Sequence, residues 1–365
     1  MSVEVPAGDR HPVVRKSGPS RPMIPRRGGT REGMTVYGFH ASHEQVPPAV
    51  LLAAAVQAEQ VGFTAAMCSD HFSPWSARQG ESGFAWSWLG AALQATESLP
   101  FGVVNAPGQR YHPAIVAQAI GSLASMYPGR FWAALGSGEA SNEHITGAPW
   151  PRKDVRNARL RECVDVIRAL LRGEEVSHDG LVTVDRARLW TRPDTVPPLV
   201  GAACSEATAR WCAEWADGLI TVNAPVEQLR RIVDAYRSAG GAGPLHLQVH
   251  VSWAPDQDTA LALAHDQWRT NVHGPPVSWD IDSADVFDVV SEHVTPEQVA
   301  RSVNVSADLG RHAAWLQEYA DLGFDAVMVH HVGQEQSAFL DAFGSEVLPQ
   351  LKVTPAPSYT AGGSR

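Results

Sequence analysis

Short apolar runs alternate with longer amphipathic segments along most of the chain. The short runs are typical of buried strands, and the longer segments repeat their apolar positions at helical spacing. We therefore predict eight strands, at residues 35–41, 64–68, 101–105, 131–135, 198–203, 217–222, 246–253 and 325–332. We predict helices at residues 47–61, 84–96, 113–126, 153–171, 205–215, 226–239, 256–268, 296–303, 309–322 and 336–351.

Two segments interrupt this alternation. Residues 175–189 place Asp179-Gly180 between alternating apolar and polar residues, which predicts a hairpin. Residues 270–293 show no clear period and contain Pro275-Pro276, so we expect an inserted loop there.

Eight successive strand–helix units favour an α/β fold, a (β/α)8 TIM barrel with inserted excursions. A doubly wound sheet is the alternative, but no Gly-x-Gly-x-x-Gly turn follows the first predicted strand. In a (β/α)8 barrel the chemistry lies where strands end and loops begin. Polar residues at those positions are therefore the candidate site residues.

Charge is unevenly distributed along the 365 residues. The chain has 29 Lys and Arg against 39 Asp and Glu, yet residues 1–33 hold seven of the basic and three of the acidic residues. The remainder carries a formal charge of −14, which argues against a general nucleic-acid or anionic-membrane partner. No apolar run is long enough to span a bilayer.

The two ends of the chain differ in composition from its body. We expect a disordered basic extension at residues 1–33, the barrel at 34–353 and a disordered tail at 354–365. Met34 is a candidate for the natural start. We expect four reduced, buried cysteines in a cytoplasmic protein, since no Cys-x-x-Cys pair occurs among Cys68, Cys163, Cys204 and Cys212.

Histidine, carboxylate and tryptophan side chains follow the predicted strands. A His and a Glu facing each other across a pocket could form a base and acid pair near neutral pH, and the Trp residues could offer flat apolar walls for a cofactor. The backbone amides of Ser137-Gly138-Glu139 could hold an anionic ring edge or a phosphate. Each of these features also has a structural alternative: the His could be a hydrogen-bonded structural residue, the Gly-x-Gly segment a tight turn, and the Trp residues part of the core. A metal held by His40, His43 and neighbouring carboxylates competes, but residues three apart at a strand end diverge, so we predict none.

Four segments resemble the bacterial luciferase-like oxidoreductases. They are residues 38–45 (GFHASHEQ), 69–75 (SDHFSPW), 110–114 (RYHPA) and 136–143 (GSGEASNE). The likeness is strongest to the coenzyme F420-dependent glucose-6-phosphate dehydrogenases and to a sub-branch that uses another flavin. It implies a luciferase-like barrel from about residue 36 to residue 351.

The resemblance implies roles for individual residues. His71 matches the base that takes a hydroxyl proton while hydride moves to the cofactor, and Glu139 matches an acid near the ring. Trp75 matches an indole at the reaction centre. Glu44 matches a neighbouring polar residue, and we place it with His40 in the substrate pocket.

Other positions match the cofactor site. Asp70 matches a residue near the ring and its polar tail, and Ser137, Gly138 and Asn142 match cofactor contacts. A non-prolyl cis peptide would fall at Val103-Val104. The Gly-Gly turn that receives the cofactor's phosphate is replaced by Ala203-Cys204, which leaves F420 and FMN open as cofactors.

This chain differs from the glucose-6-phosphate enzymes at the residues that bind the substrate. Three cations hold the sugar phosphate in the glucose-6-phosphate enzymes, and this chain has Pro225, Ser278 and Ser302 at the matching positions. Trp279 stands beside Ser278, so we also place it in the substrate pocket. Glucose 6-phosphate is therefore a poor substrate prediction.

We predict an oxidoreductase that moves hydride between a small uncharged organic substrate and F420 or FMN. An FMN-dependent monooxygenase and a non-catalytic flavin-binding protein on the same barrel are the alternatives. The resemblance alone implies a homodimer.

Overall fold

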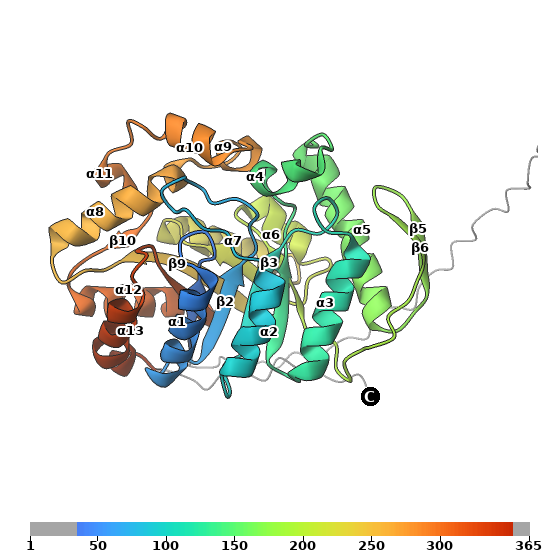
Figure 1. Ribbon diagram of the computed structural model, residues 1–365, viewed down its shortest axis with the longest axis horizontal. Helices are drawn as coiled ribbons and strands as arrows, with labels where there is room; N and C mark the ends of the chain where they lie inside the picture. Colours follow the sequence, from blue (N-terminus) through green and yellow to red (C-terminus); the bar gives the residue numbers. More distant parts are fainter. Residues whose placement is uncertain (1–34, 353–365) are drawn as a thin grey trace, which may run out of the picture. The chain divides into compact units, whose positions relative to one another are not determined.

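The computed structural model describes residues 35–352. The predicted extension, the tail and the start at Met34 therefore lie outside the described residues. Eight parallel strands form a closed barrel (Figure 1). In order around the barrel they are β1 (Val36–Ala41), β2 (Ala65–Ser69), β3 (Phe101–Asn105), β4 (Phe131–Leu135), β7 (Leu199–Ala202), β8 (Leu219–Val222), β9 (Leu245–Ser252) and β11 (Ala326–His331). The predicted (β/α)8 barrel is confirmed.

Helices cover the outside of the barrel (Figure 1). The main ones are α1 (Pro48–Gln60), α2 (Ala85–Ala95), α3 (Pro113–Met126), α5 (Lys153–Leu171), α6 (Glu206–Cys212), α7 (Val226–Ser238), α8 (Gln257–Trp268), α12 (Leu309–Asp321) and α13 (Ser337–Ala342). In α7, Leu229, Ile232 and Tyr236 recur at helical spacing and are all buried, which fixes the face that packs on the barrel.

Apolar side chains fill the interior of the barrel. They are Val36, Ala65, Met67, Trp132, Ala134, Val200, Ile220, Ala326 and Met328. The bulk of Trp132 fits because Gly102 faces it from β3, where an added Cβ would lie 2.1 Å from the indole. The barrel is therefore a packed core, and only its end is available for a site.

Of the two segments predicted to interrupt the strand–helix alternation, one has the predicted structure and the other does not. The hairpin forms as β5 (Val176–Asp179) and β6 (Thr183–Ala187). The segment expected as a loop instead holds the short helices η2 (Arg269–Val272), α9 (Val277–Asp280) and α10 (Ala284–Val290). Each makes only one or two turns, too few to show a period, and α10 is fixed by its Ser283 cap and the buried Phe287.

Smaller elements complete the described chain. They are α4 (Ala140–Glu143), η1 (His144–Thr146), α11 (Pro296–Val299) and β10 (Asn304–Val305), followed after α13 by a π-helical turn (Phe343–Val347) and η4 (Leu348–Gln350). The single closing helix predicted to residue 351 is thus broken into three parts.

The expected cis peptide at Val103-Val104 is wrong. Within residues 35–352 the cis bond is Pro275-Pro276. Val103 and Val104 instead belong to the regular β3 ladder, paired with Cys68 and Ser69 on one side and with Ala133 and Ala134 on the other. Among the described helices, none combines the length and apolar character needed to cross a membrane.

Candidate active site

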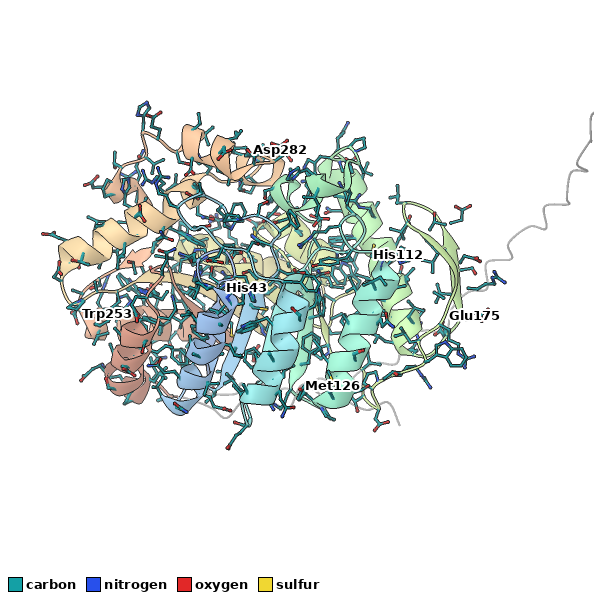
Figure 2. The ribbon with its side chains drawn as sticks, viewed as in Figure 1. His43, His112, Met126, Glu175, Trp253 and Asp282 are labelled. Carbon is teal, nitrogen blue, oxygen red and sulfur yellow. The ribbon has the colours of Figure 1, made fainter. Side chains whose placement is uncertain are left out.

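A cavity of about 410 Å³ lies at the C-terminal ends of the barrel strands. In Figure 2, His43 is labelled at this end of the barrel and Met126 at the opposite end. Every predicted site residue except Val103 lines the cavity: His40, Glu44, Asp70, His71, Trp75, Val104, Ser137, Gly138, Glu139, Asn142, Ala203, Cys204 and Trp279. Val103 is fully buried in the core outside the barrel, because neighbouring residues of a strand face opposite sides.

His71 lies between two carboxylates. Its Nδ1 is 3.0 Å from Glu44 Oε1, and its Nε2 is 3.7 Å from Glu139 Oε2. Glu44 is itself held by Ser42 Oγ and Ser69 Oγ, which donate to its Oε2 at 2.8 and 2.7 Å. The three groups come from the ends of β1, β2 and β4, so the closed barrel brings them together.

These contacts shift the pKa of each group. Burial alone would lower the pKa of His71, but the charges of Glu44 and Glu139 and a hydrogen bond to Glu44 raise it to about 9. Burial would raise the pKa of Glu44, but His71 and Ser69 bring it well below its usual value. Burial raises the pKa of Glu139, against the opposing charge of His71. At neutral pH the site therefore holds a protonated His71 beside an ionised Glu44.

Asp70 belongs to a second buried network. Asn105 Nδ2 donates to its Oδ2 at 2.6 Å, and Tyr111 Oη donates to its Oδ1 at 3.0 Å. Arg110 lies 3.6 Å from Asp70 and 3.5 Å from Glu143, measured to carboxylate oxygens. This network fixes the loop after β2 against the loop after β3, and the part played by Arg110 and Glu143 was not predicted.

Two further contacts position the loop that carries His71. Asn142 Oδ1 accepts from the backbone N of Phe72 at 2.8 Å and of Ser73 at 3.3 Å. The Trp75 ring lies edge-on to His71 with 5.2 Å between ring centres, and its other side meets Phe287 of α10 at 5.3 Å. The inserted segment thus packs directly against the loop that carries His71.

Three neutral imidazoles form one wall of the cavity. His40, His250 and His330 come from β1, β9 and β11, and burial lowers the pKa of His40 to about 4, of His250 to about 3 and of His330 well below its usual value. Trp268 Nε1 donates to His250 Nδ1 at 3.2 Å. Gln45 uses its Nε2 to donate to the Val332 carbonyl, so its Oε1 accepts from His330 Nε2 at 2.7 Å. This wall is polar but uncharged.

Small apolar residues form the facing wall. Val104, Ala202 and Ile220 come from β3, β7 and β8. In the closed strand order β3 lies across the barrel from β9, and β7 lies across from β1. A ligand between the two walls therefore meets apolar surface on one side and hydrogen-bonding rings on the other.

The cysteines differ from the prediction at one position. Cys68, Cys163 and Cys212 are buried, as expected, but Cys204 is exposed and lines the cavity. It follows β7 at the cavity wall, where a side chain faces the open space. Burial by the surrounding wall still raises the pKa of the Cys204 thiol to about 11, so the thiol is protonated at neutral pH.

The residues weighed for a metal do not converge. His43 is fully buried, with its ring 4.9 Å from Trp88, while His40 packs on His330 at 4.7 Å. Within residues 35–352, no group of three His, Cys, Asp or Glu side chains is arranged to hold a metal ion.

The comparison with known families fits this geometry. The model of a family described as luciferase-like monooxygenase matches residues 33–326. The chain belongs to this luciferase-like family. It is accordingly an oxidoreductase, and the predicted family resemblance is confirmed.

Relatives of this luciferase-like chain cover most of its length. The F420-dependent glucose-6-phosphate dehydrogenase of Intrasporangium calvum is 35% identical over 341 residues, which span 87% of this chain and 99% of the relative. An F420-dependent secondary alcohol dehydrogenase, solved with an F420–acetone adduct, is 29% identical with a TM-score of 0.80, over 87% of this chain and 99% of that one. A long-chain alkane monooxygenase is 14% identical with a TM-score of 0.69, over 87% and 91%, and shares the fold.

Proposed function

We propose that this luciferase-like protein transfers hydride between a small uncharged alcohol, or the matching carbonyl compound, and F420 or FMN. It is an F420- or flavin-dependent oxidoreductase. The proposal rests on one observation above all, the position of His71 between Glu44 and Glu139 at the cavity wall.

The cavity fits a flat, ring-shaped cofactor. Its volume of about 410 Å³ lies in the range of small-molecule sites, and Val104, Ala202 and Ile220 offer a smooth apolar wall opposite the acid–base groups. When bound, F420 or FMN supplies or accepts the hydride. Asp70, Ser137, Gly138 and Asn142 lie at the same cavity and are the polar residues that we expect to hold it.

The chain's own residues handle the proton. Glu44 occupies His71 Nδ1, which leaves Nε2 as the nitrogen that can reach a substrate oxygen. With a pKa raised to about 9, His71 carries a proton at neutral pH and can donate it to the oxygen of a carbonyl that receives hydride. In the alcohol-oxidising direction, neutral His71 takes the hydroxyl proton. Trp75 shields this proton transfer on one side.

The absence of cations at three positions supports an uncharged substrate. The cavity is lined by Ser278, Trp279 and Ser302, while Pro225 caps α7 and is exposed. The wall formed by His40, His250 and His330 is uncharged as well. We therefore expect glucose 6-phosphate to be a poor substrate, although the relative from Intrasporangium calvum is a glucose-6-phosphate dehydrogenase by name.

Two substitutions test the proposal. His71→Ala and Glu139→Gln should each lower turnover across a panel of small alcohols and carbonyl compounds, by roughly 10²-fold or more, because each removes a proton-transfer group. Circular dichroism and thermal melting should show folded variants. His293→Ala, at an exposed histidine, is the matched control and should keep wild-type turnover. Full activity in both site variants would show that the site is assigned wrongly.

A monooxygenase would behave differently under the same conditions. It would consume oxygen in proportion to product, whereas hydride exchange between F420 or FMN and an alcohol or carbonyl compound does not require oxygen. The monooxygenase structure compared above is 14% identical, which bears on the fold and not on the reaction. Tight cofactor binding without turnover over the whole panel would instead favour a flavin-binding protein.

A further inference from the structure

Lys153 lines the cavity from the first residue of α5. Its Nζ donates to Ser137 Oγ at 2.5 Å and lies 4.5 Å from the centre of the Trp279 ring. The ammonium group is therefore held between the end of β4 and the inserted helix α9.

The charge of Lys153 lacks a carboxylate partner. Among the cationic groups of the cavity wall, the protonated His71 pairs with Glu44, and Arg110 pairs with Asp70 and Glu143. Across residues 35–352, no Asp or Glu oxygen lies within ion-pair distance of Lys153 Nζ. Burial and the positive charge of Arg156 lower the pKa of Lys153, while the charge of Glu139, beyond ion-pair distance, acts in the opposite direction. An anionic ligand group would supply the missing countercharge.

The position of Lys153 indicates which ligand brings that anion. Ser137 follows β4 and Cys204 follows β7, and these paired strands form the cavity edge next to the apolar wall. The imidazole wall, made by β9, β11 and β1, lies on the other side of the barrel. Lys153, which contacts Ser137, therefore lies at the cavity edge next to the apolar wall and away from the imidazole wall. F420 and FMN both carry a phosphate on the chain that extends from the ring.

We propose that Lys153 binds the phosphate group of the cofactor. This inference rests on the proposed function, because it takes F420 or FMN to be the ligand. The ammonium offers three N–H donors, and Ser137 Oγ occupies one of them, so two remain for phosphate oxygens. The Trp279 ring, 4.5 Å from Nζ, contacts the ammonium group on another side.

Ligands with and without the phosphate provide the test, and FMN and riboflavin are the pair that differs in the phosphate alone. Fluorescence titration measures the affinity for FMN against riboflavin, and for F420 against its phosphate-free deazaflavin. Lys153→Gln should lower the affinity for whichever cofactor binds, FMN or F420, by about tenfold to a hundredfold. This is the usual effect of losing a charge-assisted hydrogen bond. The affinity for the matching phosphate-free ring should change by less than about twofold. Lys153→Arg keeps the charge and should retain most of the affinity.

Arg152→Gln is the matched control, because it removes the same charge from the neighbouring residue. Arg152 is exposed and does not line the cavity, so its loss should leave all four affinities unchanged. Thermal melting should confirm that the variants are folded.

Three results would overturn the inference. Equal losses with and without the phosphate would mean that Lys153 only supports Trp279. Unchanged affinity of Lys153→Gln for FMN and F420 would mean that Lys153 does not bind the cofactor's phosphate. Wild-type protein that binds none of the four ligands would overturn the proposed function itself, and the inference with it.

Discussion

Replacing Glu44 by Gln removes the carboxylate that lies 3.0 Å from His71 Nδ1. The variant keeps the shape of the side chain and a hydrogen-bonding amide, but it loses the charge. Glu139 remains at 3.7 Å, and burial continues to favour neutral His71. We therefore expect the pKa of His71 to fall.

The magnitude follows from the raised pKa of His71. Its pKa of about 9 exceeds the ordinary value of 6.5, and at about 1.4 kcal/mol per unit the difference corresponds to roughly 3 kcal/mol. Since Glu44 provides the largest of the raising interactions, Glu44→Gln should lower the pKa of His71 by about two units or more.

Two readouts follow from this shift. The kcat/KM of alcohol oxidation requires neutral His71, so in wild type it should rise with pH until about 9, and in Glu44→Gln it should level off near neutrality. The raised pKa also stabilises the folded protein fully below pH 6.5, and this contribution is lost as pH rises through about 9. The stability gap between wild type and variant should therefore narrow at high pH.

NMR titration of labelled imidazoles measures the shift directly, with His71→Asn identifying the signal. Glu292→Gln is the control, because it removes an exposed carboxylate and should leave His71 unchanged. If the pKa of His71 were the same in Glu44→Gln as in wild type, Glu44 would not be the group that keeps His71 protonated.

Three other predictions concern stability and metals. Gly102→Ala should lower the free energy of unfolding in urea by about 1–3 kcal/mol, because the added Cβ would lie 2.1 Å from the buried Trp132 ring. Gly90→Ala in α2 is the control. Its nearest neighbour would lie at 4.0 Å, so the substitution should be neutral or stabilising. Asn142→Ala should cost about 1–2 kcal/mol, because the backbone N of Phe72 and of its neighbour lose an acceptor; equal stability would mean that water replaces Asn142. Turnover should survive treatment with EDTA, and loss of activity that returns with one metal would reopen the metal alternative.

The barrel was predictable because its strands are short, apolar and separated by helical periods. The observed bounds of β3 and β4 equal the predicted ones, and the other barrel strands differ by at most two residues at either end. Residues 270–293 were not predictable in the same way. Their helices are stabilised by single contacts, such as Phe287 against Trp75, that no local pattern contains.

The position of candidate residues at one cavity was predictable where they closely follow a strand. Glu44, His71 and Glu139 lie within four residues after β1, β2 and β4, and the barrel brings these three strand ends together. Lys153 was missed because it begins a helix and does not follow a strand. Its place at the cavity depends on contacts with Ser137 and with Trp279, which is 126 positions away along the chain. His250 was missed because its partner Trp268 sits on the following helix. Contacts between distant segments depend on the folded arrangement and leave no local signal.

The most direct test of the central claim is titration of the purified protein with F420 and with FMN in separate experiments, following cofactor fluorescence. The account predicts saturable quenching, with one binding site per chain, by at least one of the two cofactors. Binding of neither would contradict the assignment of the cavity as the site of hydride transfer.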